Sequence, residues 1–306
     1  MRSVQAPATV VMVRPHHFHP NPETAADNAF QRRASAPEAA TARAAHDEVT
    51  HAANALEQAG VRVHMFDDHG ERETPDSVFP NNWFSTHRGG HVALYPMALE
   101  SRRRERRTDV IEMLKAEYRV QDVIDYSGLE HDGLFLEGTG AMVLDHIANV
   151  AYTARSQRAD PVALERFCTH FNFEPMAFST ADAQGRAVYH TNVMMCVATE
   201  FALVGFELMR DAQRRDEVRA RLEQGGREVI ALDARQIGEF AANALELSGA
   251  DGRVLALSAR AAASLRPAQR TVIERSARLL PLAVPTIELA GGSIRCMLAG
   301  VHLARR

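Results

Sequence analysis

The sequence has 306 residues, 46% of them hydrophobic and 24% charged, and a formal net charge of −4. These values are typical of a soluble globular protein and indicate no nucleic-acid partner. No apolar run is long enough to span a membrane, and the first residues lack the apolar core of a secretory signal. The 3 cysteines argue against a disulfide framework and favour a reducing cytoplasm, and no Cys/His spacing indicates a metal site. We expect a single cytoplasmic domain over residues 1–306, without a metal.

Helical segments alternate with short apolar strands along the chain. The first helix is predicted where Val49, Ala52, Ala53 and Leu56 fall on one face, with Gly60 as its C-cap. Further helices are predicted from Thr108, from Asp160 as N-cap with Pro161 behind it, through Val218 and Leu222, and after Pro267. Strands are predicted at 61–66, 83–86, 92–95, 141–144, 149–153, 188–197, 201–206, 229–232, 254–257 and 294–303.

Polar residues recur at the same stage of successive helix–strand units, where a turn leads into a strand. They are Asn82, Glu137, His190, Asn243 and Cys296, separated by 137 − 82 = 55, 190 − 137 = 53, 243 − 190 = 53 and 296 − 243 = 53 residues. A fixed period of this size is the signature of repeated supersecondary units. Five units arranged radially would bring these positions together around one axis.

Cys296 is the candidate nucleophile among the cysteines. It follows the turn Gly291-Gly292-Ser293, stands beside Arg295 and is predicted at the start of a strand. A thiol near positive charge ionises more readily, and the thiolate is the attacking species. Cys168 and Cys196 instead lie on the apolar stripe of a helix and inside a strand, which is typical of buried structural cysteines.

His190 and Glu137 are the candidate partners of this cysteine. Strand alternation would place His190 and Asn192 on one face, and a histidine there can move protons at neutral pH. Glu137 follows Phe135-Leu136 and is predicted to be half-buried, with His190 or a substrate nitrogen as its partner; an ordinary salt bridge is the alternative.

Three other polar segments have less specific interpretations. The histidines at positions 16, 17 and 19 are interpreted as loop, because no carboxylate or cysteine accompanies them. The basic run at 102–107 is interpreted as a solvated face before a helix. Candidates for gripping the charged ends of an amino-acid substrate are Arg14, Arg155 and Arg260.

These motifs together resemble the guanidino-group-modifying superfamily, which includes arginine deiminases, dimethylarginine hydrolases, amidinotransferases and N-succinylarginine dihydrolases. The resemblance runs from the turn at 76–83 through Glu137-Gly138 and His190-Thr191-Asn192 to 291–296. It implies a five-bladed α/β propeller, the pentein fold, and a Cys, His and acidic residue acting without metal or cofactor. The opening segments VRP at 13–15, NPETA at 21–25 and NAFQ at 28–31 are most similar to the citrulline-utilisation hydrolase branch, sometimes called CtlX.

The departures from the arginine-deiminase pattern concern the substrate. Those relatives carry aspartate where this chain has Asn82, Gly140 and Asn192. A guanidinium pairs with carboxylates, whereas an amide can both donate to and accept from a neutral ureido group. N-succinylarginine dihydrolases also have an asparagine-rich pattern, so a guanidinium substrate is not excluded. The resemblance further implies that Asn82, Asn192 and Asn243 hold the substrate head, and that Asp76 matches an acidic substrate-binding position of the dimethylarginine hydrolases.

The predicted function is cysteine-dependent hydrolysis of citrulline to ornithine, ammonia and carbon dioxide, by Cys296, His190 and Glu137. The alternatives are hydrolysis of arginine, a methylarginine or an N-acylarginine and, from a different class, a non-catalytic pentein binding protein. The expected partner is a small-molecule substrate, with no nucleic acid and no membrane. The sequence leaves the oligomeric state open, with a homodimer as one option.

Overall fold

Five small sheets of identical topology form the framework of the protein. The computed structural model describes residues 4–25 and 27–306. Each sheet has three strands: the central strand pairs antiparallel with one neighbour and parallel with the other. The central strands are β1 (Thr9–Pro15), β4 (His91–Leu94), β7 (Val150–Ala154), β10 (Phe201–Val204) and β13 (Gly252–Ser258). The predicted five-unit α/β architecture is confirmed.

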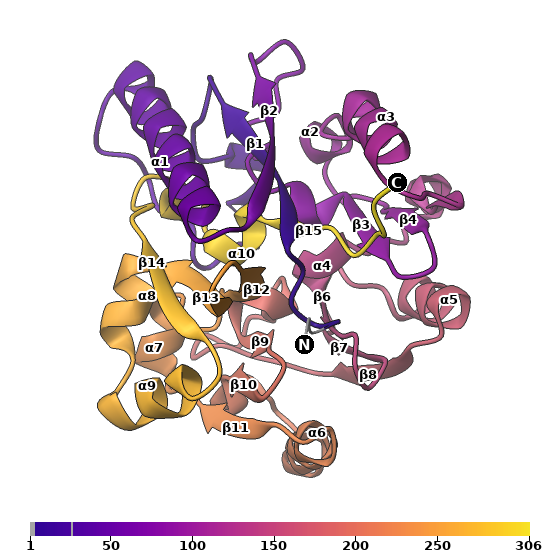
Figure 1. The fold of residues 1–306 in the computed structure, drawn as a ribbon, viewed down its shortest axis with the longest axis vertical. Coiled ribbons are helices and arrows are strands. Elements are labelled where there is room, and N and C mark those ends of the chain that lie inside the picture. Colours follow the sequence, from indigo (N-terminus) through magenta and orange to yellow (C-terminus); the bar gives the residue numbers. More distant parts are fainter. Residues whose placement is uncertain (1–3, 26) are drawn as a thin grey trace.

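The two flanking strands of each sheet differ in their position in the ring. The first strands, antiparallel to the central ones, are β15 (Ala299–Gly300), β3 (Phe84–His87), β6 (Met142–Asp145), β9 (Met195–Val197) and β12 (Leu245–Gly249). The third, parallel strands are β2 (Arg62–Asp68), β5 (Asp122–Asp125), β8 (Glu174–Phe178), β11 (Glu228–Ala231) and β14 (Arg278–Leu282). First strands of several units contact one another, so they line the middle of the ring (Figure 1).

A helical crossover joins each central strand to its parallel neighbour, as a parallel pair requires. The crossover helices are α1 (Glu38–Gln58), α3 (Thr108–Glu117), α5 (Pro161–Phe171), α6 (Ala212–Gln224), and the pair α8 (Ala259–Ser264) and α9 (Pro267–Glu274). The predicted cap of α5 is confirmed, because the Asp160 side chain accepts hydrogen bonds from the backbone N–H groups of Val162 and Ala163. Gly60, just beyond α1, has φ = +85°, as its predicted role requires.

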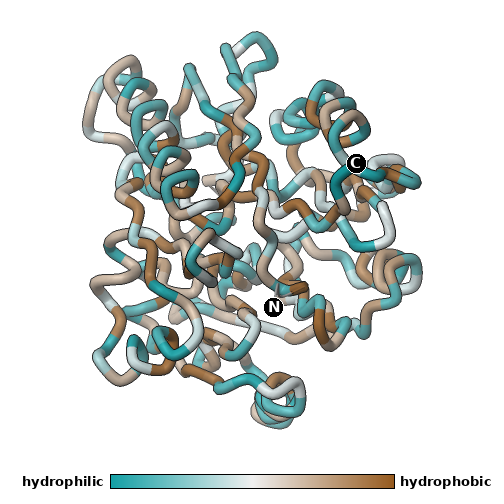
Figure 2. Tube along the Cα trace, in the orientation of Figure 1, coloured by the Kyte–Doolittle hydropathy of each residue, from teal (hydrophilic) through white to brown (hydrophobic). Residues whose placement is uncertain are grey.

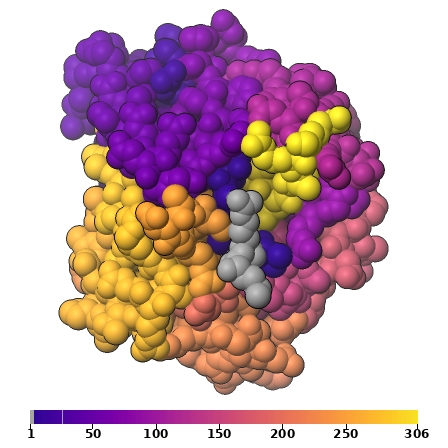
Figure 3. All heavy atoms as spheres, in the orientation of Figure 1, coloured from indigo at the N-terminus to yellow at the C-terminus, as the bar shows by residue number. Residues whose placement is uncertain are grey.

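The ring is closed by joining the two ends of the chain. The last strand, β15, pairs with the first, β1, in the register Val10↔Gly300 and Val11↔Ala299. Figures 1 and 3 show the yellow C-terminal segment lying against segments from the first part of the chain. Apolar residues concentrate between the sheets and helices, while the outer faces of the helices are hydrophilic (Figure 2). Among the residues described, no helix combines the length and apolarity needed to cross a membrane.

Shorter helical segments connect these elements. Those that precede first strands are η2 (Pro80–Asn82), α4 (Gly138–Ala141), η4 (Thr191–Val193) and α10 (Ile294–Met297). The others are η1 (Pro22–Thr24), α2 (Glu100–Arg103), η3 (Ser127–Asp132), η5 (Phe206–Leu208), α7 (Ala234–Gly238) and η6 (Ile287–Ala290).

Two of the predicted strands are wrong in a way that affects the site. Residues 188–197 form a strand only at β9, because Thr191–Val193 turn as a 3₁₀ helix, and residues 294–303 form the helical turn α10 before the short β15. His190 and Asn192 therefore do not share a strand face, and Cys296 does not begin a strand. Each lies on a tight turn that ends at a buried strand.

Candidate active site

The five periodic residues occupy equivalent places in the five units. Asn82 ends η2, Glu137 and His190 directly precede α4 and η4, and Cys296 lies within α10; Asn243 precedes β12 by two residues. All five side chains are buried. Hydrogen bonds join Glu137 to His190 and Asn243 to Cys296, so the ring brings these distant positions together as the period predicted.

The sulfur of Cys296 receives two amide hydrogen bonds. Asn192 Nδ2 and Asn243 Nδ2 each donate to Sγ over 3.3 Å. Asn243 also accepts from the Arg295 backbone N–H at 3.0 Å, which fixes the turn that carries the cysteine. Hydrogen bonds donated to a sulfur stabilise its anionic form. The Asn192 Oδ1 atom is buried and has no partner among the residues described, so it can accept from a ligand.

His190 is held by Glu137 on one side of its ring. A 2.8 Å hydrogen bond joins His190 Nε2 to Glu137 Oε2 and leaves Nδ1 for chemistry. Burial lowers the pKa of His190 below its ordinary value, although the bond to Glu137 opposes that shift. A neutral imidazole of this kind can accept a proton from a thiol or a water molecule.

Glu137 is completely buried, not half-buried as predicted. Its Oε2 atom lies 3.5 Å from Arg158 Nη1 and 3.6 Å from Arg102 Nη1, and its Oε1 accepts the Ala98 backbone N–H at 3.1 Å. Burial alone would raise the pKa of Glu137, but the charge of Arg158 and the bond to His190 outweigh it, and the pKa is lowered. Glu137 is therefore an ionised group that orients His190.

Arg102 and Arg158 are site residues that the sequence analysis missed. Arg102 is buried and makes a paired hydrogen bond to Glu105 at 2.8 and 3.0 Å, so its assignment to a solvated basic run is wrong. Their spacing from the periodic residues is the one feature of the sequence that could have identified them. Arg102 follows Asn82 by 102 − 82 = 20 residues, and Arg158 follows Glu137 by 158 − 137 = 21. The two arginines therefore occupy matching places in neighbouring units.

Asp76 and Asn82 both contact the Arg102 guanidinium rather than the sulfur. Asp76 Oδ2 lies 3.9 Å from Arg102 Nε, and burial raises the pKa of this aspartate despite that charge. The orientation of the Asn82 amide that satisfies its neighbours turns the oxygen towards both Arg102 Nη atoms at 3.0 Å and the nitrogen towards Asn81 Oδ1 at 3.1 Å. The predicted substrate-binding set is thus divided: Asn192 and Asn243 touch Cys296, while Asp76 and Asn82 position an arginine.

Asn21, Asp27 and Asn28 contact this cluster. Asn21 Nδ2 donates to Asp76 Oδ2 at 2.9 Å, and Asn28 Nδ2 donates to the Ala290 carbonyl at 3.1 Å, just before the turn that leads to the cysteine. Asp27 forms a two-pronged ion pair with Arg158, including an Nε–Oδ2 bond of 2.7 Å. These contacts attach Asn21, Asp27 and Asn28 to three different parts of the cluster.

The three arginines proposed from sequence for the substrate's charged ends lie elsewhere. Arg14 pairs with Asp67, Arg260 pairs with Glu239, and Arg155 is exposed. Among the residues described, none of the three makes a hydrogen bond or ion pair with a periodic residue, and their role in substrate binding stays a prediction.

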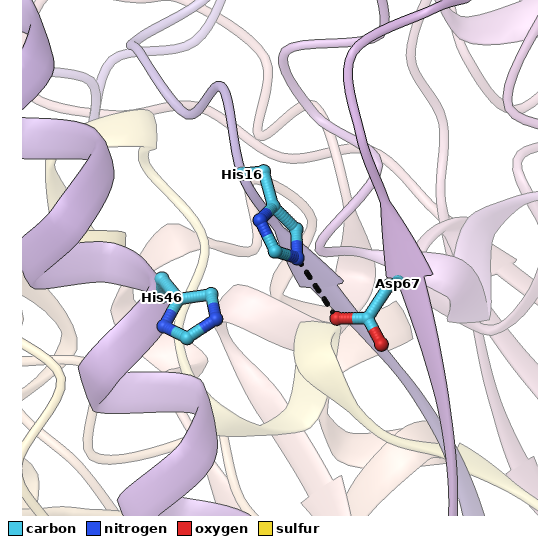
Figure 4. Close-up of side chains that lie close together, drawn as sticks. All are labelled: His16, His46 and Asp67. Carbon is cyan, nitrogen blue, oxygen red and sulfur yellow. Dashed lines mark hydrogen bonds and ion pairs between the residues drawn. The ribbon is translucent and has the colours of Figure 1, made fainter.

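The histidine tract near the N-terminus has a carboxylate partner that the sequence did not reveal. His16 Nε2 bonds Asp67 Oδ1 at 2.9 Å, and His46 of α1 faces the same pair (Figure 4). The ligand atoms of these three residues lie within 4.8 Å of one another, a grouping suited to a metal ion. Arg14 already donates to both oxygens of Asp67, at 2.7 and 3.0 Å, which competes with a metal for that ligand. The cluster shares no residue with the candidate active site.

Gly140 is required by the close approach of two site residues. A Cβ atom at position 140 would lie 2.1 Å from the nearer terminal atom of the Asn82 side-chain amide and 2.8 Å from His190 Nδ1. Any larger side chain at this position has no room unless both neighbours move.

We expect Gly140→Ala to lower kcat by about 100-fold, because a displacement of roughly 1 Å in a positioning group has that effect. Gly128→Ala is the matched control, since nothing lies within 4 Å of its added Cβ. Steady-state kinetics of both variants test this, and equal activities would contradict the role given to Gly140.

The three cysteines should differ in reactivity. Burial raises the pKa of both Cys168 and Cys196 to about 12, so almost no thiolate forms at either near neutrality. At about pH 8 we expect iodoacetamide to label Cys296 at least about 100-fold faster than the other two. Peptide mass spectrometry measures the three rates, and labelling spread evenly over the cysteines would contradict the assignment.

A ring of five such sheets, with a cysteine, a histidine and a glutamate on matching turns, defines the guanidino-group-modifying superfamily with the pentein fold. Within it, the family model described as N,N dimethylarginine dimethylhydrolase, eukaryotic, matches residues 14–303, and the chain belongs to this family. No curated protein matches the chain.

Solved structures share the fold at low sequence identity. The N-terminal domain of a mutant of ArgZ bound to substrate, an arginine dihydrolase from the ornithine–ammonia cycle in Cyanobacteria, has a TM-score of 0.74 at 15% identity, over 96% of this chain and 97% of that one. Unliganded AgrE has a TM-score of 0.75 at 16% identity, and the match covers 97% of this chain but 40% of AgrE. A dimethylarginine dimethylaminohydrolase adduct has a TM-score of 0.63 at 14% identity, over 97% and 99% of the two chains.

Proposed function

We propose that the chain is a cysteine-dependent hydrolase acting on the ureido group of citrulline, as in the CtlX-like branch that its opening motifs resemble. This proposal rests on one observation: the side chains that contact the Cys296 sulfur are uncharged amides. Two amide nitrogens contact Sγ, and the unpartnered Asn192 Oδ1 is the acceptor beside them. A ureido group offers both an oxygen and N–H groups, which such amides complement.

The carboxylates of the site are already paired. Glu137 faces His190 and two arginines, and Glu105 is bonded to Arg102. Asp76 and Asp27 also pair with these two arginines. Among the residues described, no carboxylate is hydrogen-bonded to the sulfur, whereas two amides are. A substrate head held at the sulfur would therefore meet uncharged amides directly, which favours a neutral ureido group over a guanidinium cation. Arg158, bonded to Asp27, is the cation best placed to exchange that partner for a substrate carboxylate.

The residues support a two-step hydrolysis. The Cys296 thiolate attacks the ureido carbon, and the histidine, held by Glu137, protonates the nitrogen that departs as ammonia or as the ornithine amine. His190 then takes a proton from water, which attacks the carbamoyl-enzyme and frees the thiolate and a carbamic acid. The carbamic acid loses carbon dioxide, which breaks the remaining C–N bond and releases the second amine. Citrulline and water thus give ornithine, ammonia and carbon dioxide, with no cofactor consumed.

The second candidate is hydrolysis of arginine or a methylated arginine. The observation in its favour is the family match, since the family is described by its action on dimethylarginine. A cytoplasmic location and homodimer formation stay predictions of the sequence.

The test is release of ammonia and ornithine from citrulline, with arginine and dimethylarginine in parallel reactions. Turnover of citrulline alone supports the ureido proposal. Dimethylamine or ammonia released from the guanidino compounds, with none from citrulline, would transfer the assignment to the second candidate. Cys296→Ala protein serves as the blank for contaminating activity.

A further inference from the structure

A small cavity lies on the axis of the ring. Its walls include residues from the first strand of every unit, among them Ser85, Leu144, Cys196, Leu245 and Gly300. Its volume is about 40 Å³. A space of this size holds a few water molecules or one small ion, given that a water needs roughly 10–15 Å³ by the same measure.

The cavity is lined by one permanent positive charge. Arg295, the residue before Cys296, borders it together with His146 and His302. The two imidazoles stack with ring centroids 4.0 Å apart. Burial lowers the pKa of His146 to about 3 and holds that of His302 far below its ordinary value, so both are neutral near pH 7. Exposed Arg88 and buried His87, whose pKa burial also lowers, are the other basic groups that act on this pair.

Arg295 differs from the other deeply placed arginines in having no acidic partner. Arg102 is paired with Glu105, Arg158 with Asp27 and Arg227 with Asp145. The hydrogen bond that Arg295 donates from its side chain goes to the Leu298 carbonyl at 2.9 Å, and no carboxylate of the described residues pairs with it. A cation removed from water without a counter-charge is unfavourable, so the cavity attracts an anion.

Size and charge restrict the anion. One guanidinium balances one negative charge, and the cavity is too small for a bulky organic ion. Arg295 keeps some accessible surface, unlike the three paired arginines, which are almost fully buried, and it borders the cavity, so there is room for an ion beside it.

We propose that the axial cavity binds a small monovalent anion, of the halide or nitrate class, on Arg295, and that the bound anion reduces the thiolate population at Cys296. The second effect follows because Arg295 directly precedes Cys296 in the chain, and a negative ion held beside the arginine repels a negative charge on the neighbouring sulfur. Anion binding does not depend on the proposed function, while its catalytic consequence rests on Cys296 being the nucleophile.

The test follows the iodoacetamide alkylation rate of Cys296 while sodium chloride replaces sodium gluconate at constant ionic strength and pH. We expect a saturable decrease of about threefold or more. Crystals soaked in sodium bromide should show anomalous density beside the Arg295 guanidinium. No substrate is involved, so protein inactive on citrulline still gives a decisive answer.

Two variants at the cavity wall make the test specific. His302→Glu places a carboxylate beside Arg295. In this variant Cys296 should be alkylated slowly, at a rate that does not depend on chloride, and bromide affinity should fall by at least about tenfold. His302→Gln adds no charge and should keep the saturable response. A wild-type rate unaffected by chloride, missing bromide density, or equal responses of the two variants would each overturn the proposal.

Discussion

Replacing Cys296 with serine is expected to lower turnover by at least about 1,000-fold, because a serine hydroxyl stays protonated where a thiol can ionise. The two amide donors at 3.3 Å are placed for sulfur and would not activate the smaller oxygen. The side chains are nearly the same size, so the fold should persist. Ammonia release under saturating substrate measures the loss, and thermal unfolding checks the fold.

Cys196→Ser is the matched control for this experiment. Cys196 is also buried, lies in β9 and takes no part in the contacts around Cys296. Its replacement should leave kcat within about twofold of wild type, although a buried hydroxyl costs some stability. A Cys296→Ser variant that retained a tenth of wild-type activity, or a Cys196→Ser variant that lost as much as Cys296→Ser, would refute the nucleophile assignment.

The repeat architecture was predictable because each unit is a local helix–strand module with its own spacing. The predicted helix start at Thr108 is confirmed, although no side chain caps it. The Asp160 cap of α5 and the turn at Gly60 after α1 depend on residues within one turn and are also confirmed. Five strands were not among those predicted: the central strand β1, the first strand β12 and the third strands β5, β8 and β14. Proline explains the last two. Both contain a proline, at positions 175 and 281, which edge strands tolerate but sequence patterns read as a break.

The site was predictable only where the period pointed to it. Its five register positions were found, whereas Arg102 and Arg158 were not, since their meaning depends on partners from other segments. Arg158 meets Asp27 from a segment 158 − 27 = 131 residues away. In the same way, the apolar run after Asn192 indicates a strand, but contacts of Asn192 and Thr191 with other units hold its start in a 3₁₀ turn.

Glu137→Gln should damage both stability and catalysis. The glutamine would leave Arg102 and Arg158 short of negative charge, and breaking a buried ion pair in this way costs about 3–5 kcal/mol of unfolding free energy. The amide would also lose the ionic hold on the His190 imidazole, for which we expect about a 100- to 10,000-fold decrease in kcat. Denaturant unfolding and steady-state kinetics at about pH 7 measure the two effects.

Glu246→Gln is the control for losing a buried carboxylate. Glu246 is also buried, but its partner is Arg253, and both lie in the β12–β13–β14 unit, away from Glu137. Removing this buried carboxylate should leave kcat close to wild type; a catalytic loss similar to that of Glu137→Gln would show that Glu137 acts through folding alone. The pH dependence gives an independent check. Since the pKa of Glu137 is lowered on folding from its ordinary 4.5, its charge stabilises the protein above that pH. The contribution is lost as the pH falls towards the folded pKa, so the stability gap between wild type and Glu137→Gln should be largest near neutrality and narrow in acid.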